Sequence, residues 1–119
     1  MYFRFENLEV WKDAKAFVNE IYGATKSFPK DEQFGLTSQI RRAALSVLLN
    51  ITEGSDRKSD AELKRFLRIS ITSVEEVIAA LYIAKDQSMI DQPEFSGLYK
   101  KANEIVARIN SLIRTLSQS

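Results

Sequence analysis

The sequence contains no cysteine and no histidine. These two absences exclude disulfide bonds, thiolate nucleophiles, imidazole general bases and zinc-finger ligand sets. Catalysis would have to rest on other groups, and the carboxylates nearest to apolar helical stretches are Glu53, Glu75 and Glu76. We expect these carboxylates to cap helices or to pair with Arg41 or Arg42, because an unpaired buried charge is costly. The sequence therefore predicts a protein that is not an enzyme and that uses no metal and no cofactor.

The sequence also lacks an excess of either charge, because 17 Lys and Arg residues face 16 Asp and Glu residues, for a formal net charge of +1. A nucleic-acid surface would therefore have to be a local patch. The longest weakly polar stretch, residues 43–52, is about half of the ~20 apolar residues that a membrane-spanning helix needs. The start of the chain shows neither the basic nor the apolar region of a signal peptide. We expect a cytoplasmic protein with no membrane partner.

Glycine and proline are scarce, at 4 and 2 residues, and hydrophobic residues make up 45% of the sequence. The hydrophobic residues recur at helical spacing, and no long stretch alternates as a half-buried strand does. This pattern predicts an all-α chain of four helices in a single domain, residues 1–119. Short links between the helices favour an antiparallel up-down-up-down four-helix bundle.

Turn and cap residues place the first two helices. The first is expected to begin near Asn7, a good N-cap residue, and to end before Pro29. The second is expected to follow Pro29 directly, with Asp31 and Glu32 in its first turn, where carboxylates suit the helix dipole. It should continue to Glu53 and end at Gly54 in a left-handed conformation.

The last two helices carry clearer start signals. Ser59-Asp60-Ala61-Glu62 is a capping-box pattern, and the third helix should run from there to about Ser88. The fourth should start after Asp91-Gln92-Pro93-Glu94, a second cap pattern with proline in the first turn. Its apolar residues form a continuous seam at steps of four and three: Leu98, Ala102, Ile105, Ile109, Leu112 and Leu116.

A second apolar face is present besides the one that a bundle core needs. On the second helix, Leu45 and Leu49 lie opposite the core face and Leu48 lies between the two faces. On the third helix, Ile69 and Ile83 also lie off the core face. These residues are either ordinary exposed aliphatics of a monomer or the subunit contact of a homo-oligomer.

Cations concentrate in the middle of the chain. Seven of them fall between residues 41 and 68: Arg41, Arg42, Arg57, Lys58, Lys64, Arg65 and Arg68. Four carboxylates lie in the same segment (Glu53, Asp56, Asp60 and Glu62), which leaves it at net +3. Cations near the start of the third helix oppose its dipole, and phosphate binding would explain their presence. A merely solvated helix surface is the alternative.

Four segments together suggest a known family: Gln39-Ile40-Arg41-Arg42-Ala43-Ala44, Asn50-Ile51-Thr52-Glu53-Gly54, Arg57-Lys58-Ser59 and Ser73-Val74-Glu75-Glu76. With Phe5-Glu6-Asn7-Leu8-Glu9-Val10-Trp11-Lys12 at the start, the chain resembles the four-helix-bundle family encoded in intervening sequences of bacterial 23S ribosomal RNA genes. The resemblance covers nearly the whole chain. Thr52 departs from the pattern, since the family often has Ala there.

The resemblance implies an antiparallel four-helix bundle that forms a ring-like homo-oligomer, a pentamer, in a bacterial cytoplasm. A related accessory protein of diversity-generating retroelements implies contact with nucleic acid and with another protein. The residues that match the family motif are Asn50, Glu53, Gly54, Ser73 and Glu76, and their role is either structural or functional. The structural interpretation has Asn50 and Glu53 binding backbone groups across the bundle and Arg57 pairing with Glu53.

Two functional hypotheses follow. The first is a non-enzymatic homo-oligomer that binds structured RNA or DNA through phosphate contacts of the seven cations, with little direct base readout. The second is a protein-binding scaffold of undefined process, in which the cations serve only solubility.

Overall fold

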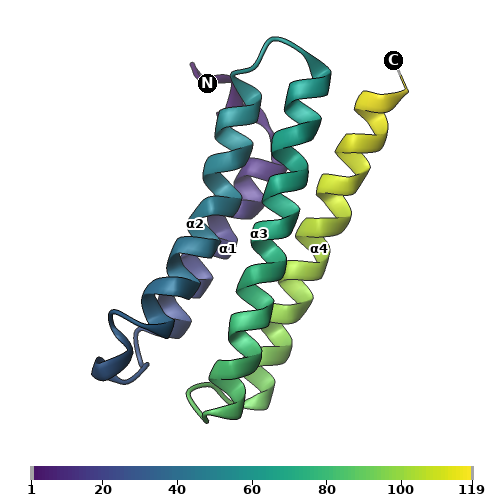
Figure 1. Ribbon diagram of the computed structural model, residues 1–119. Helices are drawn as coiled ribbons and strands as arrows, with labels where there is room; N and C mark the ends of the chain where they lie inside the picture. The colour runs from purple at the N-terminus through teal and green to yellow at the C-terminus, as the bar shows by residue number, and fades with distance from the viewer. Residues whose placement is uncertain (1, 119) are drawn as a thin grey trace.

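Four long helices alternate in direction along the chain in the computed structural model, which describes residues 2–118 (Figure 1). They are α1 (Glu9–Thr25), α2 (Leu36–Ser55), α3 (Asp60–Asp86) and α4 (Gln92–Ser117), with short 3-10 turns η1 (Arg4–Asn7) and η2 (Lys30–Glu32). Each helix packs on its neighbours in chain order, and α4 returns to α1. No strand occurs among the described residues. The predicted all-α, antiparallel four-helix bundle is confirmed.

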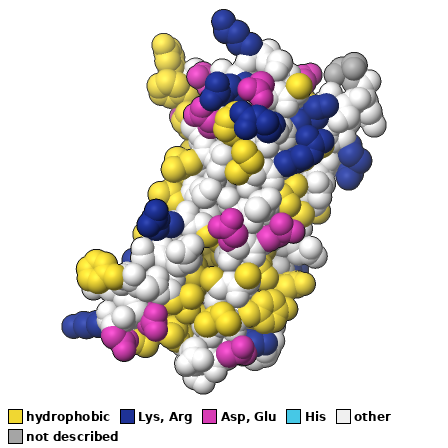
Figure 2. Space-filling view, viewed as in Figure 1, with side chains coloured by type: hydrophobic (Ala, Val, Ile, Leu, Met, Phe, Trp, Pro, Cys, Tyr) yellow, Lys and Arg dark blue, Asp and Glu magenta, His cyan; other side chains and the backbone are white. Residues whose placement is uncertain are grey.

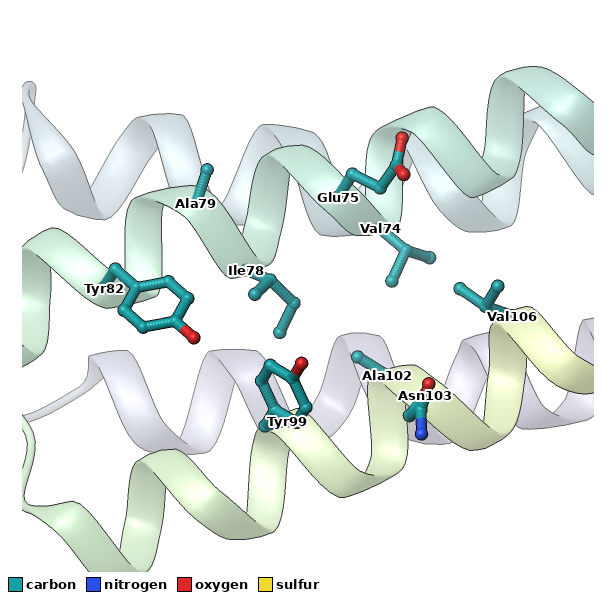
Figure 3. A pocket seen from close by; sticks show the side chains of 9 residues that line it. All are labelled: Val74, Glu75, Ile78, Ala79, Tyr82, Tyr99, Ala102, Asn103 and Val106. Carbon is teal, nitrogen blue, oxygen red and sulfur yellow. The ribbon is translucent and has the colours of Figure 1, made fainter.

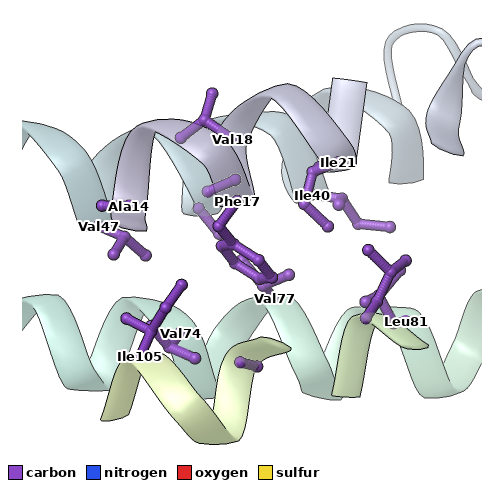
Figure 4. Packing of buried hydrophobic residues seen from close by; sticks show 14 of the residues in the cluster. Ala14, Phe17, Val18, Ile21, Ile40, Val47, Val74, Val77, Leu81 and Ile105 are labelled. Atoms are coloured by element: carbon purple, nitrogen blue, oxygen red, sulfur yellow. The ribbon is translucent and has the colours of Figure 1, made fainter. Parts of the chain in front are cut away.

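The core is one cluster of buried apolar side chains from all four helices (Figure 4). Phe17 projects from α1 into its centre, and Ile40, Leu67 and Ile109 are buried from the other helices. Each such side chain contributes about 1.5–3 kcal/mol when it is fully buried. The helical spacing of these residues in the sequence is therefore what holds the bundle together.

The first two helices begin later than predicted. Asn7 is not an N-cap, because it closes the turn η1, in which the Leu8 N–H donates to the Phe5 carbonyl at 3.0 Å. The second helix does not follow Pro29 directly either. Gly35 interrupts the chain after η2 with a non-helical backbone (φ −113°, ψ −113°), and the Glu32 carboxylate then accepts the Leu36 N–H at 3.0 Å. The acidic turn therefore precedes α2 and caps its first N–H group, instead of forming its first turn.

Both later helix starts are confirmed. The Ser59 hydroxyl accepts the Glu62 N–H at 3.2 Å, and the Asp91 carboxylate accepts the Glu94 N–H at 2.9 Å. α3 ends at Asp86, close to the predicted Ser88. In α4 the buried seam continues from Ile109 to Ile113, and Leu112 and Leu116 are only partly buried.

Gly54 does not end α2, which corrects the prediction. No glycine among the described residues has a positive φ, and α2 continues through Ser55. Gly54 is buried against α3, where an added Cβ would lie 2.8 Å from Phe66 Cβ and 3.1 Å from a methyl of Leu63. Glycine is required here because the two helices approach closely.

Candidate functional site

Five of the seven predicted cations gather at one end of the bundle, around the turn between α2 and α3: Arg57, Lys58, Lys64, Arg65 and Arg68. We call these five residues the basic end. Figure 2 shows dark blue side chains concentrated there, with carboxylates among them. The antiparallel pairing of α2 with α3 brings the end of one helix to the start of the next. Residues 57 and 68 therefore lie on the same end of the molecule.

Two of the five are partly neutralised. Arg57 forms an ion pair with Glu53, as predicted, and Arg65 Nε donates to Glu62 at 2.9 Å. Both guanidinium groups lie over the ring of Phe66, at 5.1 Å and 4.4 Å from its centroid. The hydrogen bond and charge of Arg65 lower the pKa of the Glu62 carboxyl, and the same contact raises the pKa of Arg65. These contacts hold the two guanidinium planes in place at the surface.

The other three cations supply the available positive charge. Within residues 2–118, the side chains of Lys58 and Arg68 have no ion-pair or hydrogen-bond partner. Lys64 Nζ donates only to the Ser117 hydroxyl of α4, at 3.3 Å. A lysine or arginine without a carboxylate partner can contact a phosphate without first breaking an ion pair.

Arg41 and Arg42 lie elsewhere. They stand near the start of α2, whereas the basic end begins where α2 ends, so roughly 20 Å of helix separates them. Arg41 Nε donates to the Thr25 hydroxyl at 2.8 Å, and its guanidinium lies over the ring of Tyr22. Arg41 therefore joins α2 to α1, and it forms no ion pair with a carboxylate of the described residues.

The structure adds two cations that the sequence interpretation missed. Arg4 of η1 donates to the Ser55 carbonyl at 3.0 Å, and Arg114 lies in the last turn of α4. Both are exposed at the end of the bundle that carries the basic end. For Arg114 a signal existed, because in an antiparallel bundle the end of α4 must lie beside the start of α3.

Three of the motif residues have structural roles inside the α2–α3 pair. Asn50 Nδ2 donates to the Ser46 carbonyl at 2.9 Å and to its hydroxyl at 3.0 Å, and that hydroxyl shares a 2.8 Å hydrogen bond with Ser73. Gly54 permits the close approach described above. Asn50 thus binds a backbone group of its own helix, whereas the prediction placed that bond across the bundle. Glu76 is exposed.

The predicted carboxylate roles are only partly as expected. Glu53 pairs with Arg57 and makes no cross-bundle backbone bond among the described residues. Glu75 and Glu76 are exposed and form no ion pair with Arg41 or Arg42. No described carboxylate is therefore placed in a buried, catalytic environment.

The departure from the family pattern at Thr52 has a specific contact. Its hydroxyl accepts the indole N–H of Trp11 at 2.9 Å, which joins α1 to α2. An alanine at this position could not make that bond.

The second apolar face is exposed as predicted. Leu49 is 53% exposed and Ile83 is 51% exposed, while Leu45 and Ile69 are each just over one third exposed. Leu48 is partly buried against the core. These side chains remain on the outer surface of the α2–α3 pair after the core has formed.

A shallow groove of about 440 Å³ runs between α3 and α4 (Figure 3). Ile78 and Tyr82 of α3 face Tyr99 of α4 across it, and the Glu75 carboxylate points away from α4. The lining is mostly apolar, and no hydrogen bond joins a nucleophile to a base there among the described residues. The groove can hold an apolar group, but it lacks the parts of a catalytic site.

Two further properties of the described residues bear on other functions. Between residues 2 and 118 there is no group of three or more Asp or Glu side chains that could hold a metal ion. In the same part of the chain, no helix combines the length and the apolar character that crossing a membrane requires.

Comparison with known proteins identifies the family. No curated protein matches the chain. A crystal structure at 1.70 Å of a protein with unknown function, from the S23 ribosomal protein family of Bacteroides thetaiotaomicron VPI-5482, has the same fold. Its TM-score is 0.80 at 22% sequence identity, over 87% of this chain and 97% of that chain. The family model described as 23S rRNA-intervening sequence protein matches residues 6–111, so the chain belongs to the 23S rRNA-intervening sequence protein family.

Proposed function

We propose that this protein is a non-enzymatic homo-oligomer that binds structured RNA or DNA through phosphate contacts at the basic end. The observation that carries the proposal is the placement of Lys58, Lys64 and Arg68 on one end of the bundle, with no carboxylate partner between residues 2 and 118. α3 begins at Asp60, so Lys64 and Arg68 lie in its second and third turns, beyond the first turn in which a cation opposes the helix dipole. Phosphate binding is therefore favoured by the missing carboxylate partners and not by the dipole.

The chemistry of these side chains suits phosphates and gives little base recognition. Lysine is a flexible point charge, and arginine can bind a phosphate with two donors. Nothing at the basic end resembles a recognition helix that is shaped for a groove, since its cations come from a turn and from the outer face of α3. We therefore expect affinity that falls steeply with salt and depends little on sequence.

Self-association would strengthen such a site. The charge of one basic end is modest, because four carboxylates accompany its five cations between residues 53 and 68. An oligomer would repeat the site once per subunit, and the second binding event would then become intramolecular. The exposed aliphatic residues Leu45, Leu49, Ile69 and Ile83 are the surface that we assign to the subunit contact.

Equilibrium binding across a salt series tests the nucleic-acid proposal. Purified protein is titrated with a structured RNA and with duplex DNA, and log affinity is plotted against log salt. The triple variant Lys58→Glu, Lys64→Glu, Arg68→Glu should weaken binding and flatten the slope by about 0.9 for each duplex phosphate contact that is lost.

The matched control reverses three exposed cations away from the basic end: Lys26→Glu, Lys30→Glu and Lys100→Glu. It changes the net charge by the same amount. Equal loss in both triple variants would show attraction to overall charge and would contradict a site at the basic end. Absence of binding at low salt would overturn the proposal.

The subunit contact has its own test. Leu45→Asp with Leu49→Asp should yield monomers, which light scattering would detect as a drop in mass, because two charges would then be buried at the contact. The control Phe34→Asp changes a 91% exposed apolar residue that does not belong to the second apolar face. An unchanged mass in the double variant would contradict the assignment.

A protein-binding scaffold is the second candidate function. The observation that favours it is the apolar α3–α4 groove with Tyr82 and Tyr99 exposed beside it. Under this hypothesis, Tyr82→Ala with Tyr99→Ala would abolish binding of a partner protein while the charge-reversal triple variant would leave it intact.

A further inference from the structure

The largest exposed aromatic cluster lies at the N-terminal side of the bundle. Tyr2 is 92% exposed and Phe3 is 56% exposed. Their rings meet edge to face at 4.9 Å, and Phe3 stacks on Phe5 at 5.8 Å with 10° between the planes. Phe5 in turn contacts Trp11 at 4.8 Å. We call these four residues the aromatic arm.

The inner half of the arm is fixed to the bundle. The Trp11 indole N–H donates to Thr52 of α2, and Arg4 donates to the Ser55 carbonyl at the end of α2. Glu6 accepts the Phe3 N–H at 2.9 Å, which holds the turn η1 closed. The exposed rings of Tyr2 and Phe3 are therefore presented by an ordered turn.

The arm lies next to the basic end. Ser55, to which Arg4 is bonded, is two residues before Arg57 in the chain. Figure 1 places η1 and the turn between α2 and α3 at the same end of the molecule, and Figure 2 shows hydrophobic side chains there beside the dark blue ones. Aromatic faces and cations thus share one surface.

Neighbouring rings and cations favour a single class of ligand. Contiguous exposed apolar surface on a protein usually marks a contact site. A base offers a π-face to an aromatic ring while its phosphate meets a cation, and this combination is how proteins bind single strands. Bases inside a duplex are already stacked on each other, so only unpaired ones can use the rings.

We infer that the aromatic arm stacks unpaired nucleotides of a bound RNA on Tyr2 and Phe3, while the basic end contacts the phosphates beside them. This inference rests on the proposed function and names its substrate class, an RNA in which a paired region adjoins a single-stranded one. Arg4 directly follows Phe3 in the chain and contacts Ser55, near the basic end. It therefore adds a cation between the rings and the phosphate contacts.

The test compares two RNAs: a blunt hairpin and the same hairpin with a single-stranded adenosine tail. The wild-type protein should bind the tailed hairpin more tightly, on the order of tenfold for one stacked base. The variant Tyr2→Ala, Phe3→Ala should lose that advantage and keep its affinity for the blunt hairpin.

Phe34 provides the matched control. It is 91% exposed and lies between η2 and α2, at the opposite end of the bundle. Phe34→Ala should bind both hairpins as the wild type does, since its ring is remote from the basic end. Light scattering on the double variant reports whether the arm instead touches a second copy of the chain.

The outcomes separate this inference from the proposed function. Equal binding of both hairpins by the wild type overturns the inference and leaves the phosphate contacts standing. The inference is also overturned if the Tyr2→Ala, Phe3→Ala variant still binds the tailed hairpin more tightly than the blunt one. It is overturned as well if light scattering shows that this variant has a lower mass than the wild type. Failure to bind either hairpin at low salt overturns the inference together with the RNA part of the proposed function, and the titration with duplex DNA decides the rest.

Discussion

The contact between α2 and α3 includes small and hydroxylated side chains, whereas the buried face of α4 consists of apolar side chains. The α2–α3 seam contains the Ser46–Ser73 bond, the bond from the Ser70 hydroxyl to the Val47 carbonyl at 2.9 Å, and Gly54. The α4 seam contains Leu98, Ala102, Ile105, Ile109 and Ile113. The first seam is directional because hydrogen bonds fix its register, whereas the second is held by the packing of apolar side chains, with polar contacts only at its exposed edges.

The difference explains where the surface features lie. The α2 and α3 helices pack closely, and both the basic end and the outward aliphatic residues belong to this pair of helices. The aliphatic α4 seam is accompanied by grooves, and exposed ion pairs bridge α4 to α1, such as Arg108 to both oxygens of Asp13 at 2.8 Å. That contact raises the pKa of Arg108. Exposed pairs of this kind contribute little stability.

The largest effect on the free energy of unfolding is expected when a large buried side chain of the α4 seam is shortened. Ile109 is completely buried. Ile109→Ala should lower the free energy of unfolding by about 2–5 kcal/mol, because it removes contacts and leaves a cavity. Urea titration followed by circular dichroism measures the change. Ile83→Ala, on the exposed face, should change it by less than about 0.5 kcal/mol.

At the α2–α3 seam, an added side-chain atom should lower the free energy of unfolding, because the two helices leave no room for it. Gly54→Ala places a Cβ 2.8 Å from Phe66 Cβ, which is too near the backbone to swing aside. We expect a net loss of about 1–3 kcal/mol from overpacking. Gly97→Ala is the control, since nothing lies within 4 Å of its added Cβ, and it should stabilise α4 by up to about 1 kcal/mol. Stabilisation in both variants would contradict the close approach.

Loss of a single hydrogen bond should have a smaller effect. Ser73→Ala removes the partner of Ser46 across the seam and should cost about 1 kcal/mol in thermal unfolding. Thr72→Ala is the adjacent control, because the Thr72 hydroxyl bonds only to the Arg68 carbonyl of its own helix. Equal melting temperatures for the two variants would show that the Ser46–Ser73 bond does not hold the register.

The smallest effect concerns the surface of the α2–α3 pair. Because Arg65 lowers the pKa of Glu62, this carboxyl adds stability above its ordinary titration range and loses it as the pH falls through the folded-state pKa. In an NMR pH titration, Arg65→Gln should raise the midpoint of Glu62. Lys64→Gln should leave it where it is, since Lys64 bonds to Ser117. A midpoint that does not move in Arg65→Gln would contradict the ion pair.

Local signals in the sequence were reliable where one residue decides the outcome. Ser59 and Asp91 cap the helices that their patterns predict, and the spacing of apolar residues places the core faces. Gly54 was misread because a helix stop and a close helix contact both call for glycine, and sequence alone does not separate the two. The grouping of Arg41 and Arg42 with the other cations failed because adjacency in sequence was taken as adjacency in space.

By itself, the sequence determined four amphipathic helices and the caps that begin α3 and α4, because periodicity and capping act within a few residues. The family was indicated by motif segments spread over nearly the whole chain, and the match over residues 6–111 establishes it. Only the tertiary structure decided which cations share a surface, that η1 with Arg4 lies at their end of the bundle, and that Gly54 faces α3. The Arg4–Ser55 contact joins residues 51 positions apart, and the Gly54–Phe66 approach joins residues in two successive helices. Such contacts arise from helix packing, which brings distant segments together and leaves no local pattern in the chain.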